Sequence, residues 1–302
     1  MILVDILTKK SLYNRPLCIA LGFFDCVHIG HKSLIERTVK MASEMGGKSC
    51  VATFTNNPYA VLDKADKLIF TFEERVALLE ELKIDCVYVE NFNTEIMNTG
   101  REKFLDDLFC ALPISGVVCG YDYRFGLGAS GNAEYLCNYA RNKGVMCDVI
   151  QPVMLENERV SSTLVRSALV CGDIERAKKL LGHDYFISGE VCHGRGVGHL
   201  YCFPTANIEV SNEKMLPREG VYATLTVVDG KEYTSVTNVG GKPTFGVDSV
   251  TVESMLVDFS GNLYRKNIAT VFVKRLRDIV KFDSPIKLRN QIFNDAGWRK
   301  NL

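Results

Sequence analysis

The sequence predicts a two-domain protein in which an α/β domain with a Rossmann-like parallel sheet precedes a six-stranded antiparallel β-barrel. The length of 302 residues suits two domains, because domains commonly contain about 100–200 residues. Strand-like and helix-like segments alternate in the first half, which is typical of a parallel sheet with helices on both faces. In the second half, strand-like segments follow one another directly, which indicates an antiparallel barrel.

The first half contains five short apolar runs that predict buried parallel strands. They lie at residues 17–21, 49–54, 86–89, 115–119 and 146–153. The helical spacing of apolar residues predicts helices between them, at residues 31–45, 71–82, 104–110 and 132–143. Thr71 and Glu74 form the pattern of a capping box at the start of the second helix. Two more helical stretches follow Ser161, and the second stops at Gly182.

The character of the chain changes after Gly182, so we expect domains at residues 1–182 and 185–302. Barrel strands are expected at residues 186–192, 203–210, 221–228, 231–239, 250–259 and 263–275. Asp229-Gly230 is a strong signal for a type I′ hairpin, and Ser260-Gly261-Asn262 separates the last two strands. One amphipathic helix, near residues 285–295, follows the strands.

The composition favours a small-molecule partner. Lys plus Arg and Asp plus Glu both number 36, giving a formal net charge of zero, whereas nucleic-acid-binding proteins usually show a basic excess. The 11 cysteines include no Cys-x-x-Cys pair, and most lie among apolar residues. We therefore expect no nucleic-acid partner, and reduced buried thiols rather than disulfides or a zinc site.

We expect neither a membrane span nor a secretion signal. No run approaches the roughly 18 apolar residues that a span requires. Asp5 interrupts the apolar start and no long apolar region follows, which predicts a cytoplasmic protein without a signal peptide. The oligomeric state is left open.

The segment from Gly22 to His31 lies between the first predicted strand and the first predicted helix, where α/β proteins bind phosphates. The helix N-terminus favours anions, and glycine lets the backbone approach a phosphate closely. His28 and His31 are three residues apart, so they would present imidazole donors to the α- and β-phosphates of ATP. The alternative is a pair of partly buried structural histidines. The ATP-binding residues expected in this loop are Gly22, Phe23, Asp25, His28, Gly30 and His31.

A second candidate phosphate element opens the helix after Ser161. Hydroxyl groups at Ser162 and Thr163 suit a helix start, and Arg166 would clamp the β- and γ-phosphates. Taken alone, this is also the pattern of an ordinary helix cap followed by a surface arginine. Together with the histidines it predicts nucleotidyl transfer in the first half. A substrate phosphate can attack the α-phosphorus directly, so alignment and charge stabilisation suffice and no nucleophilic residue is required.

His-x-Gly-His also occurs in class I aminoacyl-tRNA synthetases, and this alternative predicts a Lys-Met-Ser-Lys-Ser loop late in the catalytic domain. The partial match Lys40-Met-Ala-Ser43 lies within the first predicted helix, too close to the histidines. A tRNA partner also requires a basic surface, so we set this alternative aside.

Further motifs extend along the chain. They are Thr53-Phe54, Pro58, Gly120-Tyr-Asp-Tyr-Arg-Phe-Gly126, Gly189-Glu-Val-Cys-His-Gly194, Phe203-Pro-Thr-Ala-Asn-Ile208, Gly220-Val-Tyr222, Asn238-Val-Gly240, Pro243-Thr-Phe245 and Val252-Glu253. With these motifs the chain resembles the bifunctional bacterial riboflavin kinase/FAD synthetases over nearly its whole length. The resemblance implies adenylylation of FMN to FAD in the first half and ATP-dependent phosphorylation of riboflavin to FMN in the second.

The resemblance also implies flavin-binding residues in the first half. The isoalloxazine ring would lie near Phe54, Pro58, Asp122 and Phe125. For Phe54 and Phe125 the competing interpretation is packing in the core. Asp122 lies in a polar, glycine-flanked loop, which favours a functional role.

The second half would hold ATP, Mg²⁺ and riboflavin. Thr205 and Asn207 are two residues apart, so on a strand they share one face. As neutral ligands they suit Mg²⁺, which keeps waters and substrate phosphates in its shell. A flexible loop with Gly194, Gly196 and Gly198 would cover ATP. The resemblance makes Glu253 the base that takes the proton from the ribityl 5′-hydroxyl, and the alternative is an outward-facing strand residue.

The sequence departs from the family pattern at several positions. Cys26 and Cys202 stand where glycine is usual, Arg265 also replaces a glycine, Met255 a histidine and His199 an arginine. Most of these departures lie in the kinase half. They leave open a flavin-binding regulatory or sensor protein, or an FAD synthetase with a weakened kinase half, whereas the retained Thr205, Asn207 and Glu253 favour the bifunctional enzyme.

Overall fold

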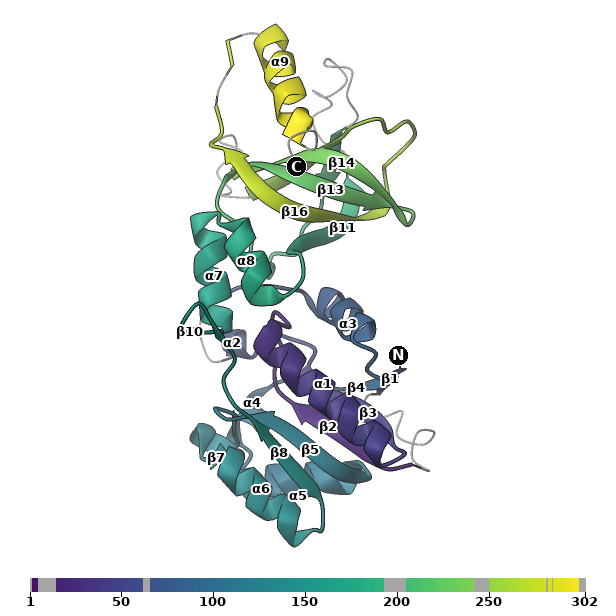
Figure 1. Ribbon diagram of the computed structural model, residues 1–302, viewed down its shortest axis with the longest axis vertical. Coiled ribbons are helices and arrows are strands. Elements are labelled where there is room, and N and C mark those ends of the chain that lie inside the picture. The colour runs from purple at the N-terminus through teal and green to yellow at the C-terminus, as the bar shows by residue number, and fades with distance from the viewer. Residues whose placement is uncertain are drawn as a thin grey trace. The chain divides into compact units, whose positions relative to one another are not determined.

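The computed structural model describes residues 2–4, 15–61, 66–192, 205–241, 250–280, 282–283 and 285–298. They form two compact units, Met1–Ser161 and Ser162–Leu302, which are called the first and second unit below (Figure 1). The first unit is built on an open sheet and the second on a closed barrel.

The described part of the first unit contains a six-stranded sheet in which every neighbouring pair is parallel, as the sequence predicted. The strand order is β1-β4-β3-β2-β5-β8. Their bounds are β1 Ile2–Val4, β2 Leu17–Leu21, β3 Lys48–Phe54, β4 Cys86–Glu90, β5 Ile114–Gly120 and β8 Met146–Ile150. The short edge strand β1 was not predicted. The chain leaves β2 toward β3 and later returns on its other side as β5, so the strand order reverses at β2 and β5, where such sheets bind ligands.

Helices cover both faces of this sheet, which confirms the predicted fold class. The longer helices are α1 Ile29–Glu44, α3 Phe72–Glu81, α5 Arg101–Ala111 and α6 Ala133–Asn142. Ile19 and Leu21 of β2 pack with α5 and α6, whereas the thiol of Cys18 contacts Met45 at the end of α1. This alternation of side chains along β2 places the helices on opposite faces. Shorter elements are α2 Pro58–Val61, α4 Thr94–Asn98, the 3-10 turn η1 Leu127–Ala129, and the two ribbons β6 Arg124–Phe125 with β7 Gly131–Asn132 and β9 Met154–Leu155 with β10 Glu158–Arg159.

The predicted capping box at the start of α3 is present. The backbone N–H of Glu74 donates to Thr71 Oγ1 at 3.3 Å, and the backbone N–H of Thr71 donates to Glu74 Oε2 at 2.9 Å. Two of the otherwise unpaired N–H groups at this helix start are thereby satisfied.

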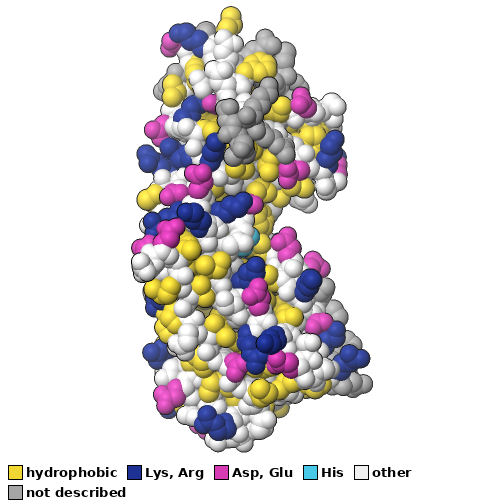
Figure 2. Space-filling view, in the orientation of Figure 1, with side chains coloured by type: hydrophobic (Ala, Val, Ile, Leu, Met, Phe, Trp, Pro, Cys, Tyr) yellow, Lys and Arg dark blue, Asp and Glu magenta, His cyan; other side chains and the backbone are white. Residues whose placement is uncertain are grey.

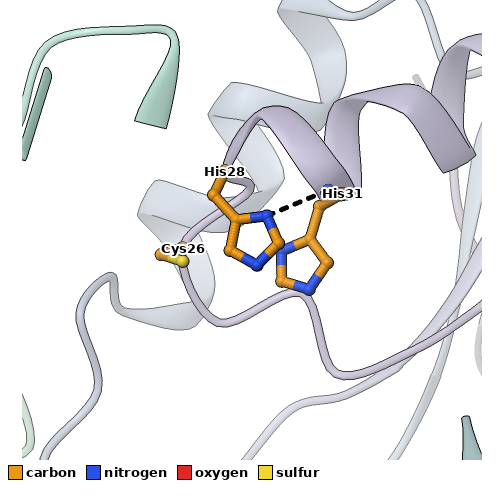
Figure 3. Close-up of side chains that lie close together, drawn as sticks. All are labelled: Cys26, His28 and His31. Carbon is orange, nitrogen blue, oxygen red and sulfur yellow. Dashed lines mark hydrogen bonds between the residues drawn. The ribbon is translucent and has the colours of Figure 1, made fainter. Parts of the chain in front are cut away.

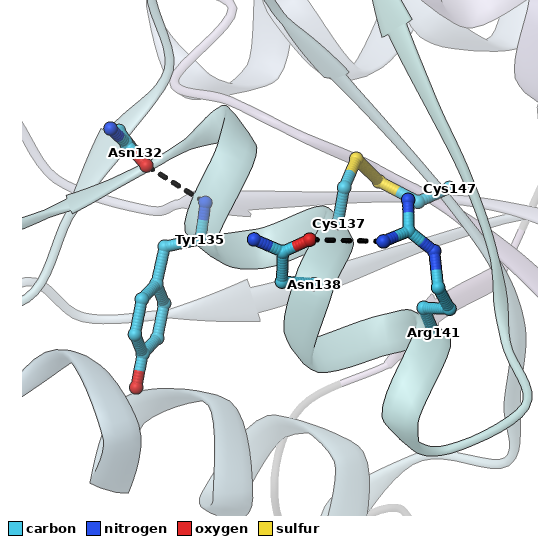
Figure 4. Close-up of a disulfide and its surroundings, with 6 residues drawn as sticks. All are labelled: Asn132, Tyr135, Cys137, Asn138, Arg141 and Cys147. Atoms are coloured by element: carbon cyan, nitrogen blue, oxygen red, sulfur yellow. Dashed lines mark hydrogen bonds between the residues drawn. A yellow bond between two sulfur atoms is a disulfide. The ribbon is translucent and has the colours of Figure 1, made fainter.

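The cysteine prediction is wrong for one pair. Cys137 on α6 and Cys147 on β8 form a disulfide with their Cα atoms 5.3 Å apart (Figure 4). The pair meets because α6 packs against β8, and a separation of 10 residues carries no local signature of that contact. Among the other described cysteines, five are buried free thiols, as expected: Cys18, Cys26, Cys50, Cys86 and Cys119.

Two helices precede the barrel, α7 Ser162–Cys171 and α8 Ile174–Leu181. Gly182 ends α8 in the left-handed conformation (φ +74°), and its N–H donates to the Lys178 carbonyl, as its position after the helix predicted. By their contacts both helices group with the second unit, whereas the sequence-based boundary assigned them to the first domain. The boundary after Gly182 stays a prediction.

The described strands of the second unit close into an antiparallel barrel, as predicted, with the order β11-β12-β15-β14-β13-β16. Their bounds are β11 Phe186–Cys192, β12 Thr205–Ile208, β13 Gly220–Val228, β14 Lys231–Gly241, β15 Val250–Leu256 and β16 Asn267–Arg277, and α9 Pro285–Ala296 follows. Asp229 and Gly230 both have positive φ, which confirms the type I′ hairpin. β15 and β16 follow each other in sequence but do not pair. β15 lies between β12 and β14, and β16 between β13 and β11.

Hydroxyl groups form a closed ring inside the described part of the barrel. Each contacts the next at 2.7–3.3 Å, in the order Thr224, Ser235, Thr226, Thr270, Ser254, Thr237 and back to Thr224. All six side chains are fully buried. A hydroxyl can donate once and accept as well, so a ring lets every member be satisfied without water.

We predict that Thr237→Val lowers the free energy of unfolding by about 1–3 kcal/mol. Valine keeps the volume but takes one hydrogen-bond partner from each of the buried Thr224 and Ser254 hydroxyls. Urea unfolding followed by circular dichroism measures the loss. Thr234→Val, on the outward face of the same strand, is the matched control. Equal losses in the two variants would contradict a special contribution of the ring.

Candidate active sites

The loop after β2 ends in a histidine that caps α1. The His31 backbone N–H donates to His28 Nδ1 at 3.0 Å, and the two imidazoles stack in parallel with their centroids 3.7 Å apart (Figure 3). Since Nδ1 accepts this bond, the proton of the neutral His28 ring resides on Nε2. The helix cap therefore makes Nε2 of His28 a hydrogen-bond donor, which suits a phosphate oxygen.

His31 is held neutral. Burial, and secondarily the neighbouring His28, lower its pKa well below the usual 6.5. Its Nδ1 is buried and makes no hydrogen bond in the described residues. A buried ring nitrogen without a partner marks a place where a ligand atom can be bound.

The backbone of this loop follows a strained path. Phe24 and Val27 adopt positive φ values of 54° and 47°, which residues other than glycine rarely do. A Cβ atom at Gly30 would lie 3.0 Å from the His28 ring, so glycine is required for the ring to fold back over the helix start. The loop is thus shaped to hold His28 in one orientation.

Asp25 has a structural contact in the same loop. Its carboxylate is buried, and Oδ1 accepts the backbone N–H of Ile69 at 2.9 Å. This bond ties the loop to the segment that precedes α3. A direct contact of Asp25 with ATP stays a prediction.

Cys26 joins the two histidines in a cluster whose ligand atoms lie within 4.8 Å of one another (Figure 3). This composition would admit a metal ion, but the ring geometry opposes it. The rings are parallel to within 5°, so their in-plane nitrogen lone pairs do not converge on one point. His28 Nδ1 is also occupied by the helix cap. The arrangement suits an anion better than a metal ion.

The proposed flavin residues lie near the carboxyl ends of β3 and β5. Phe54 ends β3 and contacts the ring of Phe92 edge-on at 5.0 Å. Pro58 opens α2, and Asp122 is exposed in the turn after β5. Phe54, Pro58 and Asp122 therefore follow the strands that flank β2, next to the phosphate loop.

Phe125 is a core residue. It is buried and packs against Phe104, Tyr123 and Tyr135 with ring centroids 5.4–6.4 Å apart. These contacts agree with the packing interpretation, and a contact of Phe125 with flavin stays a prediction.

Ser162, Thr163 and Arg166 open α7 and lie within one turn of each other. They belong to the second unit, whereas the histidines belong to the first. Arg166 Nη1 lies 3.8 Å from Met215 Sδ within the second unit. Joint action of these residues with His28 and His31 on one ATP stays a prediction.

The second unit aligns three polar residues on neighbouring strands. Asn207 on β12 and Asn238 on β14 both pair in register with Glu253 on β15. Residues directly opposite in an antiparallel pair share a face, so the three form a row across the barrel surface. Oδ1 of Asn207 is buried without a hydrogen-bond partner in the described residues, as expected for an oxygen reserved for a ligand. Asn238 belongs to this row, but the sequence analysis did not give it a role.

Thr205 lies two residues before Asn207 on the same face and is exposed. Its register partner Met255 is buried beneath Trp298 and the last helix, where an apolar side chain fits better than the usual histidine. The proposed Gly194, Gly196 and Gly198 loop lies outside the described residues.

Known proteins match both units. Residues 10–164 match the FAD synthetase family and residues 181–302 the riboflavin kinase family. The bifunctional riboflavin kinase/FMN adenylyltransferase of Bacillus subtilis (strain 168) is 34% identical over 282 residues, covering 91% of this chain and 89% of that protein. The protein of the same name from Escherichia coli (strain K12) is 31% identical, covering 92% and 90%. The chain belongs to the bifunctional riboflavin kinase/FMN adenylyltransferases. It is an enzyme of flavin cofactor biosynthesis with a riboflavin kinase and an FMN adenylyltransferase domain.

A crystal structure entitled macrolide-efflux protein from Streptococcus pneumoniae is also similar, with a TM-score of 0.89 and 27% identity over the whole of both chains. Efflux is named only in that title. Within the part of this chain that is described, no helix is long and apolar enough to cross a membrane. Acidic and basic side chains are interspersed among the coloured residues of Figure 2, in agreement with the zero net charge.

We predict that His31 makes the stability of the first unit fall at acidic pH. The pKa of His31 is lowered in the folded protein but is about 6.5 in the unfolded chain. Below that pH the unfolded chain binds a proton that the folded protein does not. The free energy of unfolding then decreases by up to about 1.4 kcal/mol per pH unit.

The test compares the wild type with His31→Gln, which does not titrate. Urea unfolding at about pH 7.5 and about pH 5.5 should show a smaller pH dependence in the variant. Equal pH dependence in the two proteins would show that His31 is not the group responsible.

Proposed function

We propose that the first unit binds ATP at the loop after β2 and transfers its adenylyl group to FMN. Nε2 of His28 and a ring nitrogen of His31 donate to phosphate oxygens, while the N-terminus of α1 adds its partial positive charge. The single observation that carries this proposal is the capped His28, whose hydrogen bond leaves a donor at Nε2.

In this reaction a phosphate oxygen of FMN attacks the α-phosphorus of ATP. A new P–O bond forms, the bond between the α-phosphorus and its bridging oxygen breaks, and pyrophosphate leaves. His28 and His31 stabilise the charge that develops on the phosphate oxygens and supply no nucleophile. Phe54, Pro58 and Asp122, and also Phe125, would hold the flavin. Ser162, Thr163 and Arg166 would complete the site, with Arg166 on the departing β- and γ-phosphates.

In the second unit we propose that Glu253 accepts the proton of the riboflavin 5′-hydroxyl, whose oxygen attacks the γ-phosphorus of a second ATP. Asn207 Oδ1 and Thr205 Oγ1 fit as ligands of Mg²⁺, since one is a buried oxygen without a partner and neither carries charge. Bound there, the ion would neutralise charge on the transferred phosphate. ATP and both flavins are then the small-molecule substrates, and we infer that the enzyme acts in the cytoplasm, where ATP is available.

We predict that changes in the two units separate the two activities. His28→Ala and His31→Ala should each lower FAD formation from FMN by about 10²–10³-fold, because each removes a donor to the developing charge. Phosphorylation of riboflavin should be nearly unchanged. Chromatography of the products from riboflavin, ATP and Mg²⁺ should show FMN accumulating in place of FAD.

Glu253→Gln is the matched change in the second unit, since glutamine keeps the size and removes the base. This variant should convert supplied FMN to FAD at the wild-type rate but barely phosphorylate riboflavin. Loss of FAD synthesis from FMN in folded Glu253→Gln would overturn the assignment of chemistry to the units. Wild-type protein that binds flavin but forms neither product would favour a sensor instead.

We predict that Asn207→Ala raises the Mg²⁺ concentration needed for half-maximal kinase activity. The variant loses one oxygen ligand while Glu253 remains in place. Titration of riboflavin phosphorylation with Mg²⁺ measures the shift, and FAD formation from FMN in the same samples is the control. An unchanged Mg²⁺ requirement would remove Asn207 from the proposed metal site.

A further inference from the structure

Arg75 on α3 is an almost completely buried arginine. Only 1% of its surface is exposed. Burying a guanidinium is costly unless its N–H groups are hydrogen-bonded, so its partners indicate what the charge is for. The sequence analysis gave Arg75 no role, because an arginine in an amphipathic helix has the pattern of a solvated surface residue.

Its hydrogen bonds join two separate segments. Nη1 donates to the Phe23 carbonyl at 2.9 Å and to Thr53 Oγ1 at 3.0 Å, while Nη2 donates to the Phe54 carbonyl at 2.9 Å. Thr53 Oγ1 in turn donates to the Phe23 carbonyl at 2.8 Å. The guanidinium thus connects the phosphate loop after β2 to the carboxyl end of β3.

Aromatic contacts reinforce the same connection. The guanidinium carbon lies 4.8 Å from the centroid of the Phe23 ring, and that ring meets Tyr59, next to Pro58, edge-on at 6.0 Å. Arg75 therefore fixes both the backbone and the side chain of Phe23. Its planar fork places two donor nitrogens in fixed relative positions, which the single ammonium of lysine cannot reproduce.

We propose that Arg75 is a positioning residue for FMN adenylylation. It sets the separation between the loop that carries the ATP phosphates and the strand end that carries the flavin, and so aligns the FMN phosphate with the α-phosphorus. This inference rests on the proposed function, because it takes both substrates to lie where that function places them. Arg75 itself touches neither the reacting atoms nor the bound phosphates.

The expected signature is a loss of kcat with retained binding. In Arg75→Lys the groups that contact each substrate are intact, so KM for ATP and FMN should change by less than about threefold. Misalignment by about 1 Å can cost about 10²-fold in rate, so kcat for FAD formation should fall by about 10–100-fold. Arg75→Met, which keeps no donor, should lose at least as much. Riboflavin phosphorylation by the second unit serves as the internal control for protein concentration and integrity.

Leu79→Ala is the matched structural control. Leu79 is buried on the same helix, one turn beyond Arg75, and has no polar side-chain atom to bridge the two segments. It should lower the melting temperature while kcat stays within about threefold of the wild type. The proposal requires Arg75→Lys to lose kcat at a melting temperature no lower than that of Leu79→Ala.

Two outcomes would overturn the proposal. One is a kcat for folded Arg75→Lys within about threefold of the wild type. The other is a parallel rise in KM for both substrates, or an equal loss of kcat in Leu79→Ala, since either indicates general support of the fold. Failure of the proposed function itself would be distinguishable, because wild-type protein would then not form FAD or would not respond to His28→Ala.

Discussion

The hydrogen bond from the His31 backbone N–H to His28 Nδ1 constrains both the structure and the chemistry of the first unit. It starts α1, because it satisfies an N–H that has no partner within the helix. It orients the His28 ring and determines which ring nitrogen carries the proton. The left-handed residues Phe24 and Val27 and the missing Cβ of Gly30 are the backbone conditions under which this bond can form.

The second unit depends on the alternation of side chains along its strands. Thr237 and Ser254 point into the barrel and belong to the hydroxyl ring, while their chain neighbours Asn238 and Glu253 lie on the outer face. The strands that carry the catalytic row are therefore held in register by the ring behind it. A shift of one residue would exchange the two faces and place Glu253 inside the barrel.

In the first unit the structure uses neutral groups close to the phosphates and a full charge behind them. His31 is neutral because its pKa is lowered by burial, and His28 presents a donor fixed by the helix cap. The permanent charge of Arg75 is spent on carbonyl oxygens of the surrounding loops. The residues that hold the site are in this way distinct from those proposed to contact the reacting atoms.

Much of the fold was predictable from sequence because its signals are local. Apolar runs, the Thr71 capping box and the Asp229-Gly230 turn act within a few residues, and each is present where it was expected. The motif from Gly22 to His31 also identified the phosphate loop, since the residues that shape it are consecutive. Edge strand β1 escaped prediction because its pairing with β4 joins segments more than 80 residues apart.

By itself the sequence determined the two fold classes, the family and the histidines of the first candidate site. Only the tertiary structure decided that Cys137 bonds to Cys147, that β15 and β16 lie apart in the barrel, and that Asn207, Glu253 and Asn238 form one row. It also gave Arg75 its partners in two separate segments. These features share one physical reason. Each depends on contacts between residues distant in sequence, and such contacts arise from how whole elements pack rather than from the preference of any short segment.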